Sequence, residues 1–317
     1  MKLKNNLFTA AIAAPLLAMS SYTLADIKNI DVDALLEIES ASSEFDNESD
    51  TNALSVGAME LTFSGNINEN ASMVVQFLHE DDGTPLELDV ATIRVKAFEN
   101  ADIIAGKMYV PFGAFETGHI SDPLTLELGE VRENAVSLNY SNASFVADAY
   151  AFSRLEGTEG NDYGIKLGFE SENASTAFNI SYITSLLIDG LMPDELVSLA
   201  AIGAFGQLEL GKVQLMAELV AATETYVSDA VEYQPSTFSL EAIYNFNNES
   251  TLAFGYQESE EVISLEIPTT RTLLTYSFAP IYDSVGFKVE YAHDTVEVSD
   301  DEELSGDTLT LQLSIEM

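Results

Sequence analysis

The connections between the predicted strands form two classes that alternate along the chain. From residue 30 onward, segments of about ten residues alternate apolar with polar side chains, as in 238–246 and 308–315. One class of connection is short: NINEN, ENA, SNA, ENA, LGK, NNE and APIYD. The other class is longer and acidic, for example SASSEFDNESDTN (40–52) and DTVEVSDDEELSGD (294–307). A closed antiparallel barrel of the bacterial outer membrane predicts this alternation, because its periplasmic turns are short and its outer loops are long.

The last strand shows the two faces that such a barrel needs. Alternate positions from 309 to 317 read Leu, Leu, Leu, Ile and Met, and the intervening positions from 308 to 316 read Thr, Thr, Gln, Ser and Glu. One face would meet lipid and the other water. No linker or composition break divides the chain. We therefore predict an all-β fold in which residues 26–317 form one transmembrane antiparallel β-barrel of about sixteen strands, with long outer loops and short periplasmic turns.

Tyr and Phe must form the aromatic bands at the membrane interfaces, because the chain contains no Trp. Several of these residues lie in the lipid-facing phase near predicted periplasmic strand ends: Tyr140, Phe169, Tyr244, Phe246, Tyr276 and Phe278. Others fall near the outer ends: Tyr182, Tyr256 and Tyr291. Packing of these rings in a soluble core is the alternative.

The N-terminal residues 1–25 have the features of a cleavable signal peptide. Lys2 and Lys4 precede the apolar run LFTAAIAAPLLAM, and small residues precede Asp26 at the spacing of a signal-peptidase site. Removing this segment removes two of the 12 basic residues and none of the 53 acidic ones, which leaves a net charge of 10 − 53 = −43. Such a charge argues against nucleic acid as a partner. We expect export to the outer membrane of a Gram-negative bacterium.

The connection within KMYVPFGAFETGHISDPLTLELGEVRE (107–133) differs from the others. It follows the fifth predicted strand, so it is the third outer loop. VPFGAF and PLTLEL are apolar enough to anchor on a barrel wall, and the acids Glu116, Asp122, Glu127 and Glu130 could face a channel. We predict that residues 111–131 fold inward and constrict the pore. The alternative is an ordinary solvated loop with a stiff proline turn.

Two runs of sequence in this region resemble a known family. The run GKMYVPFGAFET (106–117), followed by ISDPLTLELGEVRE (120–133), resembles the signature of the LbtU family of siderophore porins, and EDDGTPLELDVATI (80–93) resembles the segment before it. The resemblance implies an outer-membrane protein for uptake of ferric siderophores without a plug domain. Within the run, we assign structural roles to Tyr109, Pro111, Phe112, Gly113, Pro123 and Gly129.

Most basic residues of the mature chain fall in the water-facing phase of predicted strands. These are Arg94, Lys96, Lys107, Lys166, Lys212, Arg271 and Lys288. Glu60, Glu133, Glu170, Glu218, Glu241 and Glu290 share that phase. Two interpretations stay open. The charges could neutralise one another across neighbouring strands, or a basic wall that includes Arg94, Lys96 and Lys107 could oppose the acidic loop across a narrow channel. Arg132, which ends the loop, is a further pore candidate.

The predicted function is therefore an outer-membrane channel for small solutes, with ferric siderophores as the expected solute. The acidic outer loops favour cationic or neutral complexes over polycarboxylates. The alternatives are a general cation-preferring diffusion porin and a non-transporting structural or adhesin barrel. No enzyme is expected, since His79, His119 and His293 are scattered, and we predict no cofactor or metal site. The expected partners are outer-membrane lipids, lipopolysaccharide, the barrel-insertion machinery and the solute. A homo-oligomer stays open.

Overall fold

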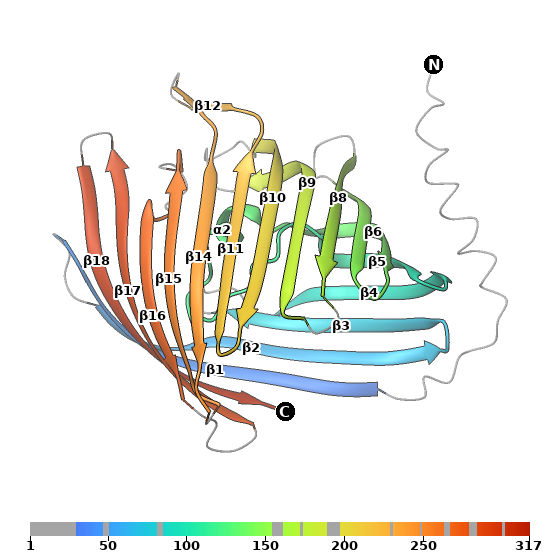
Figure 1. Cartoon of the computed structure of the whole chain (residues 1–317), viewed down its shortest axis with the longest axis horizontal. Helices are drawn as coiled ribbons and strands as arrows, with labels where there is room; N and C mark the ends of the chain where they lie inside the picture. The colour runs from blue at the N-terminus through green and yellow to red at the C-terminus, as the bar shows by residue number, and fades with distance from the viewer. Residues whose placement is uncertain are drawn as a thin grey trace.

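A single closed β-barrel forms the body of the protein (Figure 1). The computed structural model describes residues 30–46, 51–80, 85–153, 161–171, 174–188, 197–228, 231–247, 249–262, 267–278, 284–299 and 302–317. The predicted signal peptide lies outside them. Within the described ranges, no helix is both long enough and apolar enough to cross a bilayer.

Sixteen antiparallel strands close the barrel in chain order, and β1 pairs with β18 through register partners that run from Leu35↔Glu316 to Phe45↔Gly306. The barrel strands are β1 (Ile30–Phe45), β2 (Thr51–Asn68), β3 (Ala71–Glu80), β4 (Glu87–Phe98), β5 (Ala101–Tyr109), β6 (Arg132–Ser141), β7 (Phe145–Ser153), β8 (Asn161–Glu170), β9 (Thr176–Ile188), β10 (Val197–Leu210), β11 (Val213–Ala222), β14 (Ser236–Asn245), β15 (Thr251–Glu260), β16 (Thr270–Ser277), β17 (Val285–Ser299) and β18 (Glu302–Glu316). The prediction of about sixteen strands is confirmed.

Three elements do not belong to the barrel sheet. A small hairpin, β12 (Tyr226–Ser228) and β13 (Val231–Tyr233), extends the connection between β11 and β14 at the outer end. A short helix, α2 (Leu124–Gly129), belongs to the connection between β5 and β6 and contacts β11 and β14. Figure 1 shows this helix behind those two strands.

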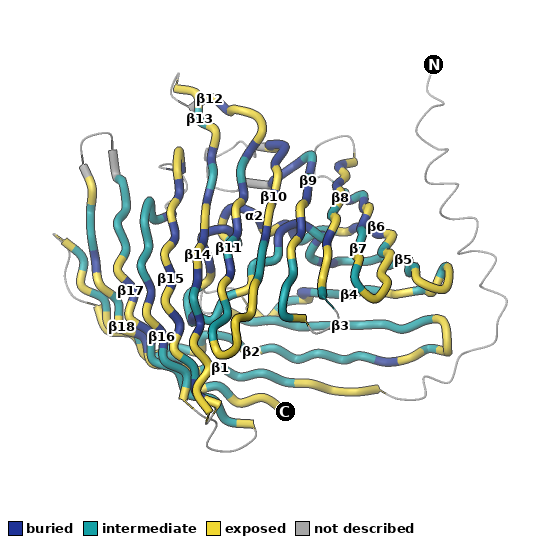
Figure 2. Tube along the Cα trace, viewed as in Figure 1, coloured by how far each residue is buried: buried dark blue, intermediate teal, exposed yellow. Residues whose placement is uncertain are grey.

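Burial follows the predicted alternation of faces (Figure 2). On β18, Leu309 is 48% exposed and Leu311 39%, whereas the alternating residues Thr310 and Gln312 are 8% and 4% exposed. The exposed residues are apolar and the enclosed ones polar, which is the inverse of a soluble protein and the arrangement of a barrel in lipid. The predicted phase of the final strand is confirmed.

Aromatic side chains form a continuous row near the short-turn ends of β14 to β17. Tyr244 and Phe246 have ring centroids 4.9 Å apart, Phe246 and Tyr276 are 6.2 Å apart, and Tyr276 and Phe278 are 4.7 Å apart. Phe287 extends the row at 5.1 Å from Phe278. Amphipathic rings favour the headgroup level of a bilayer, so this row indicates one membrane boundary.

Two of the predicted long loops are wrong in extent. β1 continues to Phe45 and β2 begins at Thr51, so most of 40–52 is strand. Likewise β17 continues to Ser299 and β18 begins at Glu302 within the predicted loop 294–307. The polar side chains of these segments led to the prediction of loops. Paired strands that project beyond the lipid have both faces in water, so neither face has to be apolar.

A charge on the outer face of the last strand should prevent assembly. Leu313 is exposed on the lipid side, and Leu313→Asp would place a carboxylate in hydrocarbon. A basic residue at the bilayer midplane costs about 2–4 kcal/mol and an acid somewhat less. We expect a marked loss of heat-modifiable protein in outer-membrane fractions, whereas Leu313→Met, which keeps an apolar side chain of similar volume at the same position, should assemble. Equal amounts of both variants would contradict the assigned face.

Candidate functional site

Hydrogen bonds hold together the two ends of the connection between β5 and β6, residues 110–131. Tyr109 and Arg132 are register partners, and Val110 donates its N–H to the Val131 carbonyl at 2.9 Å. Asp89 on β4 accepts hydrogen bonds from the Tyr109 hydroxyl at 2.9 Å and from the Arg132 guanidinium, which also binds Glu87 at 2.5 Å. Arg132 and Tyr109 therefore fasten the root of the loop, and Asp89 is a partner that the sequence did not reveal.

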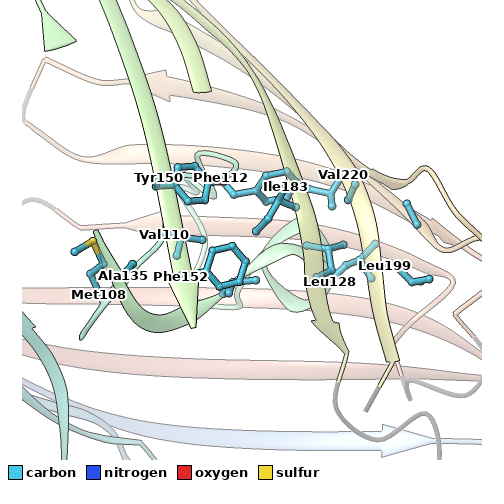
Figure 3. Packing of buried hydrophobic residues seen from close by; sticks show 14 of the residues in the cluster. Met108, Val110, Phe112, Leu128, Ala135, Tyr150, Phe152, Ile183, Leu199 and Val220 are labelled. Atoms are coloured by element: carbon cyan, nitrogen blue, oxygen red, sulfur yellow. The ribbon is translucent and has the colours of Figure 1, made fainter. Parts of the chain in front are cut away.

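Apolar side chains attach the loop to the inner wall (Figure 3). Phe112 is 3% exposed and packs in one cluster with Val110 and Leu128 of the loop. The wall supplies inward-facing apolar residues of β7, β9, β10 and β11 to the same cluster: Tyr150, Phe152, Ile183, Leu186, Leu199, Ala201, Val220 and Ala222. This part of the lumen is apolar and contacts the loop instead of water.

A tight bend follows Pro111 and Phe112. Gly113 has φ +66° and Phe115 φ 57°, which places both in the left-handed region. A Cβ on Gly113 would lie 2.3 Å from the Phe115 ring, and one on Gly129 2.9 Å from the same ring. The Phe115 ring occupies the space that a Cβ would take at both positions, and the positive φ of Gly113 is a second reason for glycine there. The Gly113 N–H binds Ser181 Oγ at 3.2 Å, and its carbonyl accepts from Lys166 Nζ at 2.6 Å.

Three buried glutamates on the barrel wall bind the loop backbone. Glu218 on β11 accepts the N–H groups of Ala114 and Phe115 at 2.6 and 2.9 Å. Glu241 on β14 accepts from the Gly118 N–H at 3.0 Å and the Thr117 hydroxyl at 2.7 Å. The carboxylates satisfy backbone donors that would otherwise be buried without partners. We call Glu218, Glu241 and Glu290 the wall glutamates.

Glu290 on β17 makes the most contacts of the three. It accepts the N–H groups of Ile120 and Ser121 at 2.6 and 3.0 Å, together with the hydroxyl groups of Ser121 at 2.5 Å and Thr275 at 2.7 Å. Since Glu218, Glu241 and Glu290 lie on β11, β14 and β17, the loop is held across a wide arc of the wall.

Basic wall residues bind the loop carbonyls. Besides Lys166, Arg271 donates to the Asp122 carbonyl at 3.1 Å, and Lys288 lies 3.5 Å from the His119 carbonyl. Arg271 also pairs with Asp294 at 2.9 Å. The lumen charges therefore neither simply neutralise one another nor form an open basic wall, because many of them bind the backbone of the loop.

His119, in the middle of the loop, is buried and binds the barrel wall through its side chain. Its Nδ1 lies 2.6 Å from the Thr275 hydroxyl, which itself donates to Glu290, so Nδ1 carries the proton and donates to Thr275. Burial lowers the pKa of His119 to about 4, against the opposing effect of Glu290. The imidazole is therefore neutral near pH 7. A Cβ on Gly255 would lie 2.5 Å from its Nε2, so that glycine makes room for the ring.

The helix α2 packs against the wall, and its one acid, Glu127, is exposed. Pro123 precedes it and accepts the Leu126 N–H at 2.8 Å. Leu124 is fully buried with Val262 and Ile267, and its N–H binds Gln257 Oε1 at 3.1 Å. The loop acids named from the sequence are all exposed: Glu116, Asp122, Glu127 and Glu130.

Acidic side chains line the gap that the loop leaves open. A cavity of about 450 Å³ lies between loop residues Ile120 to Asp122 and the opposite wall. That wall contributes Glu37 and Glu39 from β1, Glu80 from β3, and small residues of β2. We call this cavity the acidic gap. It has carboxylates on both the loop side and the wall side.

The structure does not place the loop acids opposite Arg94, Lys96 and Lys107, as the sequence analysis predicted. Arg94 lies toward the short-turn end of β4, where it pairs with Asp102 at 3.7 Å, and Lys96 lies further toward that end. Lys107 donates to the Leu88 carbonyl at 2.6 Å near the root of the loop. Because the loop crosses toward β17, Asp122 meets Glu37 and not these basic residues.

The wall glutamates were named from the sequence only as lumen charges, and their binding to the loop was missed. Polar residues are ordinary on the inner face of a barrel, so their phase carried no further information. The sequence did contain a signal for a covering segment. Strands β9 to β11 have apolar residues in the lumen-facing phase as well as the lipid-facing one, for example Ile183, Leu199 and Val220. An apolar lumen wall indicates that a segment of protein covers it.

This architecture defines a class: the protein has the porin-type fold of outer-membrane channels, with the third of its long connections, between β5 and β6, lying against the inner wall. Solved structures share the fold. OprB of Pseudomonas putida, in a structure determined at high pH, has a TM-score of 0.68 at 11% identity, and the match covers 98% of this chain and 97% of OprB. A complex of OmpF from Salmonella typhi with daunomycin gives 0.67 at 9% identity, with 91% and 97% covered. The channel DcaP of Acinetobacter baumannii gives 0.66 at 12%, with 91% and 98% covered.

Among curated proteins, the chain is similar to several that share the name UPF0422. A UPF0422 protein of Coxiella burnetii is 25% identical over 216 residues, which is 60% of this chain and 46% of the relative. UPF0422 protein lpp3030 of Legionella pneumophila is 20% identical over 288 residues, which is 76% of this chain and 54% of the relative. The chain spans about half the length of these relatives. No family model matches the sequence.

Proposed function

We propose that the protein is an outer-membrane channel for small solutes that prefers cations, and that residues 110–131 form its constriction. The acidic gap is the observation that carries this proposal. A solute that passes the loop meets Asp122 on one side and Glu37, Glu39 and Glu80 on the other. Charges in a confined lumen interact more strongly than in open water, so the gap enriches cations and repels anions.

The basic residues of this region moderate the preference. Lys166, Arg271 and Lys288 bind loop carbonyls. Lys166 lies near Glu218, but Arg271 is also a charge neighbour of Asp122 and Lys288 one of Glu37, so two of the three cations partly offset the acids of the gap. The net charge of the whole chain, −41, adds a long-range attraction for cations that shrinks as salt rises.

Reversal potentials across a salt gradient in planar bilayers test the proposal. The wild-type channel should be cation-selective at low salt, and Glu37→Gln with Asp122→Asn should lower the ratio of cation to anion permeability about two- to fivefold. We expect the cation selectivity of the wild type and the effect of the double substitution both to shrink at molar salt, where the screening length falls to about 3 Å. Glu209→Gln, at the short-turn end of β10, is the matched control. Equal potentials for all three proteins would contradict the proposed path.

The cation preference should also fall between pH 8 and pH 6. Although Glu130 is exposed to the lumen, desolvation by the surrounding protein and repulsion by Asp122 raise its pKa to about 7. The raised pKa means that Glu130 is ionised at pH 8 and mostly protonated at pH 6, which removes a negative charge from the loop. Glu130→Gln should flatten this pH dependence. If the cation preference of that variant fell as steeply with pH, groups other than Glu130 would be responsible for the pH dependence.

Ferric siderophores are the second, narrower candidate for the solute. The sequence similarity of residues 106–133 to the LbtU siderophore porins favours them, and the acids favour cationic or neutral complexes. Block of the current by micromolar ferric siderophore would support a selective channel. Unblocked ohmic conductance would favour a general diffusion porin, and a total lack of conductance would favour a structural or adhesin barrel.

The proposed setting follows from the same function. We propose that residues 1–25 direct export, that the insertion machinery reads the last strand, and that lipid and lipopolysaccharide surround the barrel. A homo-oligomer would have to form through barrel contacts.

A further inference from the structure

A groove of about 330 Å³ lies in the lipid-facing surface of β8, β9 and β10, three neighbouring strands of the barrel (Figure 1). On β10, Gly203 and Ala204 line it with bare backbone and a single methyl group. Ile180 on β9 and Ile202 on β10 line it with larger side chains that are exposed. The change from a large to a small side chain along β10 therefore produces the hollow.

Rows of register partners explain the shape of the groove. The row nearer the outer end consists of large side chains on all three strands: Ile165, Tyr182 and Ile202. In the next row toward the short turns, Leu167 and Ile180 lie beside Ala204. Gly206 follows Ala204 in the same phase, and a Cβ built there meets no atom within 4 Å. The surface of β10 therefore stays low from Ala204 toward the short turns.

The loop is anchored on the opposite side of the same piece of wall. Ser181 Oγ accepts the Gly113 N–H at 3.2 Å. A Cβ on Gly203 would lie 2.5 Å from Ser181 Oγ and 3.4 Å from the Phe112 ring. Since Ser181 and Gly203 also line the groove, one layer of backbone separates the groove from the anchor of the loop. An occupant of the groove would contact the wall directly behind Phe112.

An apolar hollow within a bilayer needs an apolar occupant. Atoms that line an unfilled space lose their dispersion contacts on that side. Of the residues that line the groove, Ser181 and Tyr182 alone have polar side chains, and the Ser181 hydroxyl binds Gly113. Lipid tails are as apolar as the wall, so close packing, and not exclusion of water, decides what fills the groove.

The shape of the groove favours a flexible chain over a second barrel. The outer wall of another copy is convex, so it would rest on the exposed side chains around the hollow: Ile165, Leu167, Ile180 and Ile202. A stable interface buries about 800 Å² on each partner with close shape complementarity, which two such surfaces do not provide. A hydrocarbon chain is narrow enough to lie between these side chains.

We propose that the groove binds an acyl chain of an outer-leaflet lipid, which lies along β10 from the level of Tyr182 toward Gly206. Tyr182 marks the outer end of the groove, and tyrosine favours the headgroup level of a bilayer, so the headgroup lies at that end. The bound chain supports the wall behind Phe112 from outside. The inference does not depend on the proposed channel function.

Tryptophan fluorescence tests the inference, because the chain has no Trp of its own. Leu167→Trp places a reporter in the groove, and Leu240→Trp places one at an exposed position of β14 outside it. Purified protein in detergent micelles is titrated with a phosphatidylglycerol that carries bromine on its acyl chain, because bromine quenches Trp on contact. Half-maximal quenching should need a lipid fraction about three- to tenfold lower for Leu167→Trp than for Leu240→Trp.

Filling the groove should remove this difference. Ala204→Phe, added to Leu167→Trp, places a ring where the acyl chain would lie, so quenching should then need the same lipid fraction as in Leu240→Trp. Ala242→Phe is the matched control, since Ala242 lies between the exposed Leu240 and Tyr244 in the outward phase of β14. Added to Leu167→Trp, it should leave the low lipid fraction unchanged, and heat modifiability verifies that every variant is folded.

Three results would overturn the inference. The first is an equal lipid fraction at half-maximal quenching for the two reporters, and the second is unchanged quenching after Ala204→Phe. The third is a purified assembly of two or more chains in which the lipid never quenches Leu167→Trp, because a second copy would then cover the groove. None of these results concerns conductance, so the proposed channel function is tested separately.

Discussion

Replacing Glu241 and Glu290 with glutamine should release the loop and raise single-channel conductance. Between them the two carboxylates accept three backbone N–H groups and the side-chain hydroxyls of Thr117, Ser121 and Thr275. A glutamine keeps one acceptor oxygen but turns an amide donor toward the remaining N–H groups. Each hydrogen bond to a charged group contributes about 1.5–3 kcal/mol, so the double substitution should loosen residues 117–121 even though Glu218, the basic wall residues and the apolar cluster still hold other parts of the loop.

The expected signature is larger and noisier current with weaker cation preference, since a mobile loop no longer keeps Asp122 against Glu37. Glu209→Gln removes a glutamate at the short-turn end of β10 and should leave conductance unchanged. Unaltered conductance in a folded double variant would mean that the apolar cluster and the remaining contacts of Glu218, Lys166 and Arg271 are enough to hold the loop.

A second large effect is expected at Gly106, just before the loop. This residue of β5 has φ +143°, and a Cβ there would lie 1.9 Å from the carbonyl oxygen of Ala91 on β4. Both the backbone conformation and the close approach of the two strands require glycine. Gly106→Ala should therefore sharply lower the yield of heat-modifiable barrel.

Gly206 provides the matched control for that change. It lies in β10, and no atom comes within 4 Å of a Cβ built there. Gly206→Ala should assemble like the wild type in the same membranes. Comparable yields of the two alanine variants would contradict the tight packing of β4 against β5.

The architecture could be predicted from the sequence because its signals are local and periodic. The alternation on β18 and the alternation of short and long connections follow directly from lipid outside, water inside and a closed sheet. The ends of β1, β2, β17 and β18 could not be predicted, since strands that extend beyond the membrane lose the apolar phase.

The site itself was less accessible to sequence analysis. The loop and its exposed acids were visible in residues 107–133, but the wall glutamates come from strands more than ninety residues away in the chain. Their partners are backbone N–H groups, which leave no trace in side-chain patterns. For the same reason the path of the loop toward β17, which sets Asp122 against Glu37 and away from Arg94, depends on tertiary contacts alone.

The position of the loop is the central claim, and thiol accessibility on whole cells measures it most directly. The chain has no native Cys, so a single cysteine at Ala114 or at Val227 is the only target. Val227 lies in β12 and is 59% exposed, whereas Ala114 packs on the wall beside Glu218. A maleimide attached to a bulky polyethylene glycol should modify Cys-substituted Val227 rapidly and Cys-substituted Ala114 slowly, and both equally after denaturation. Equal rates on intact cells would show that the loop lies outside the barrel and would contradict the account.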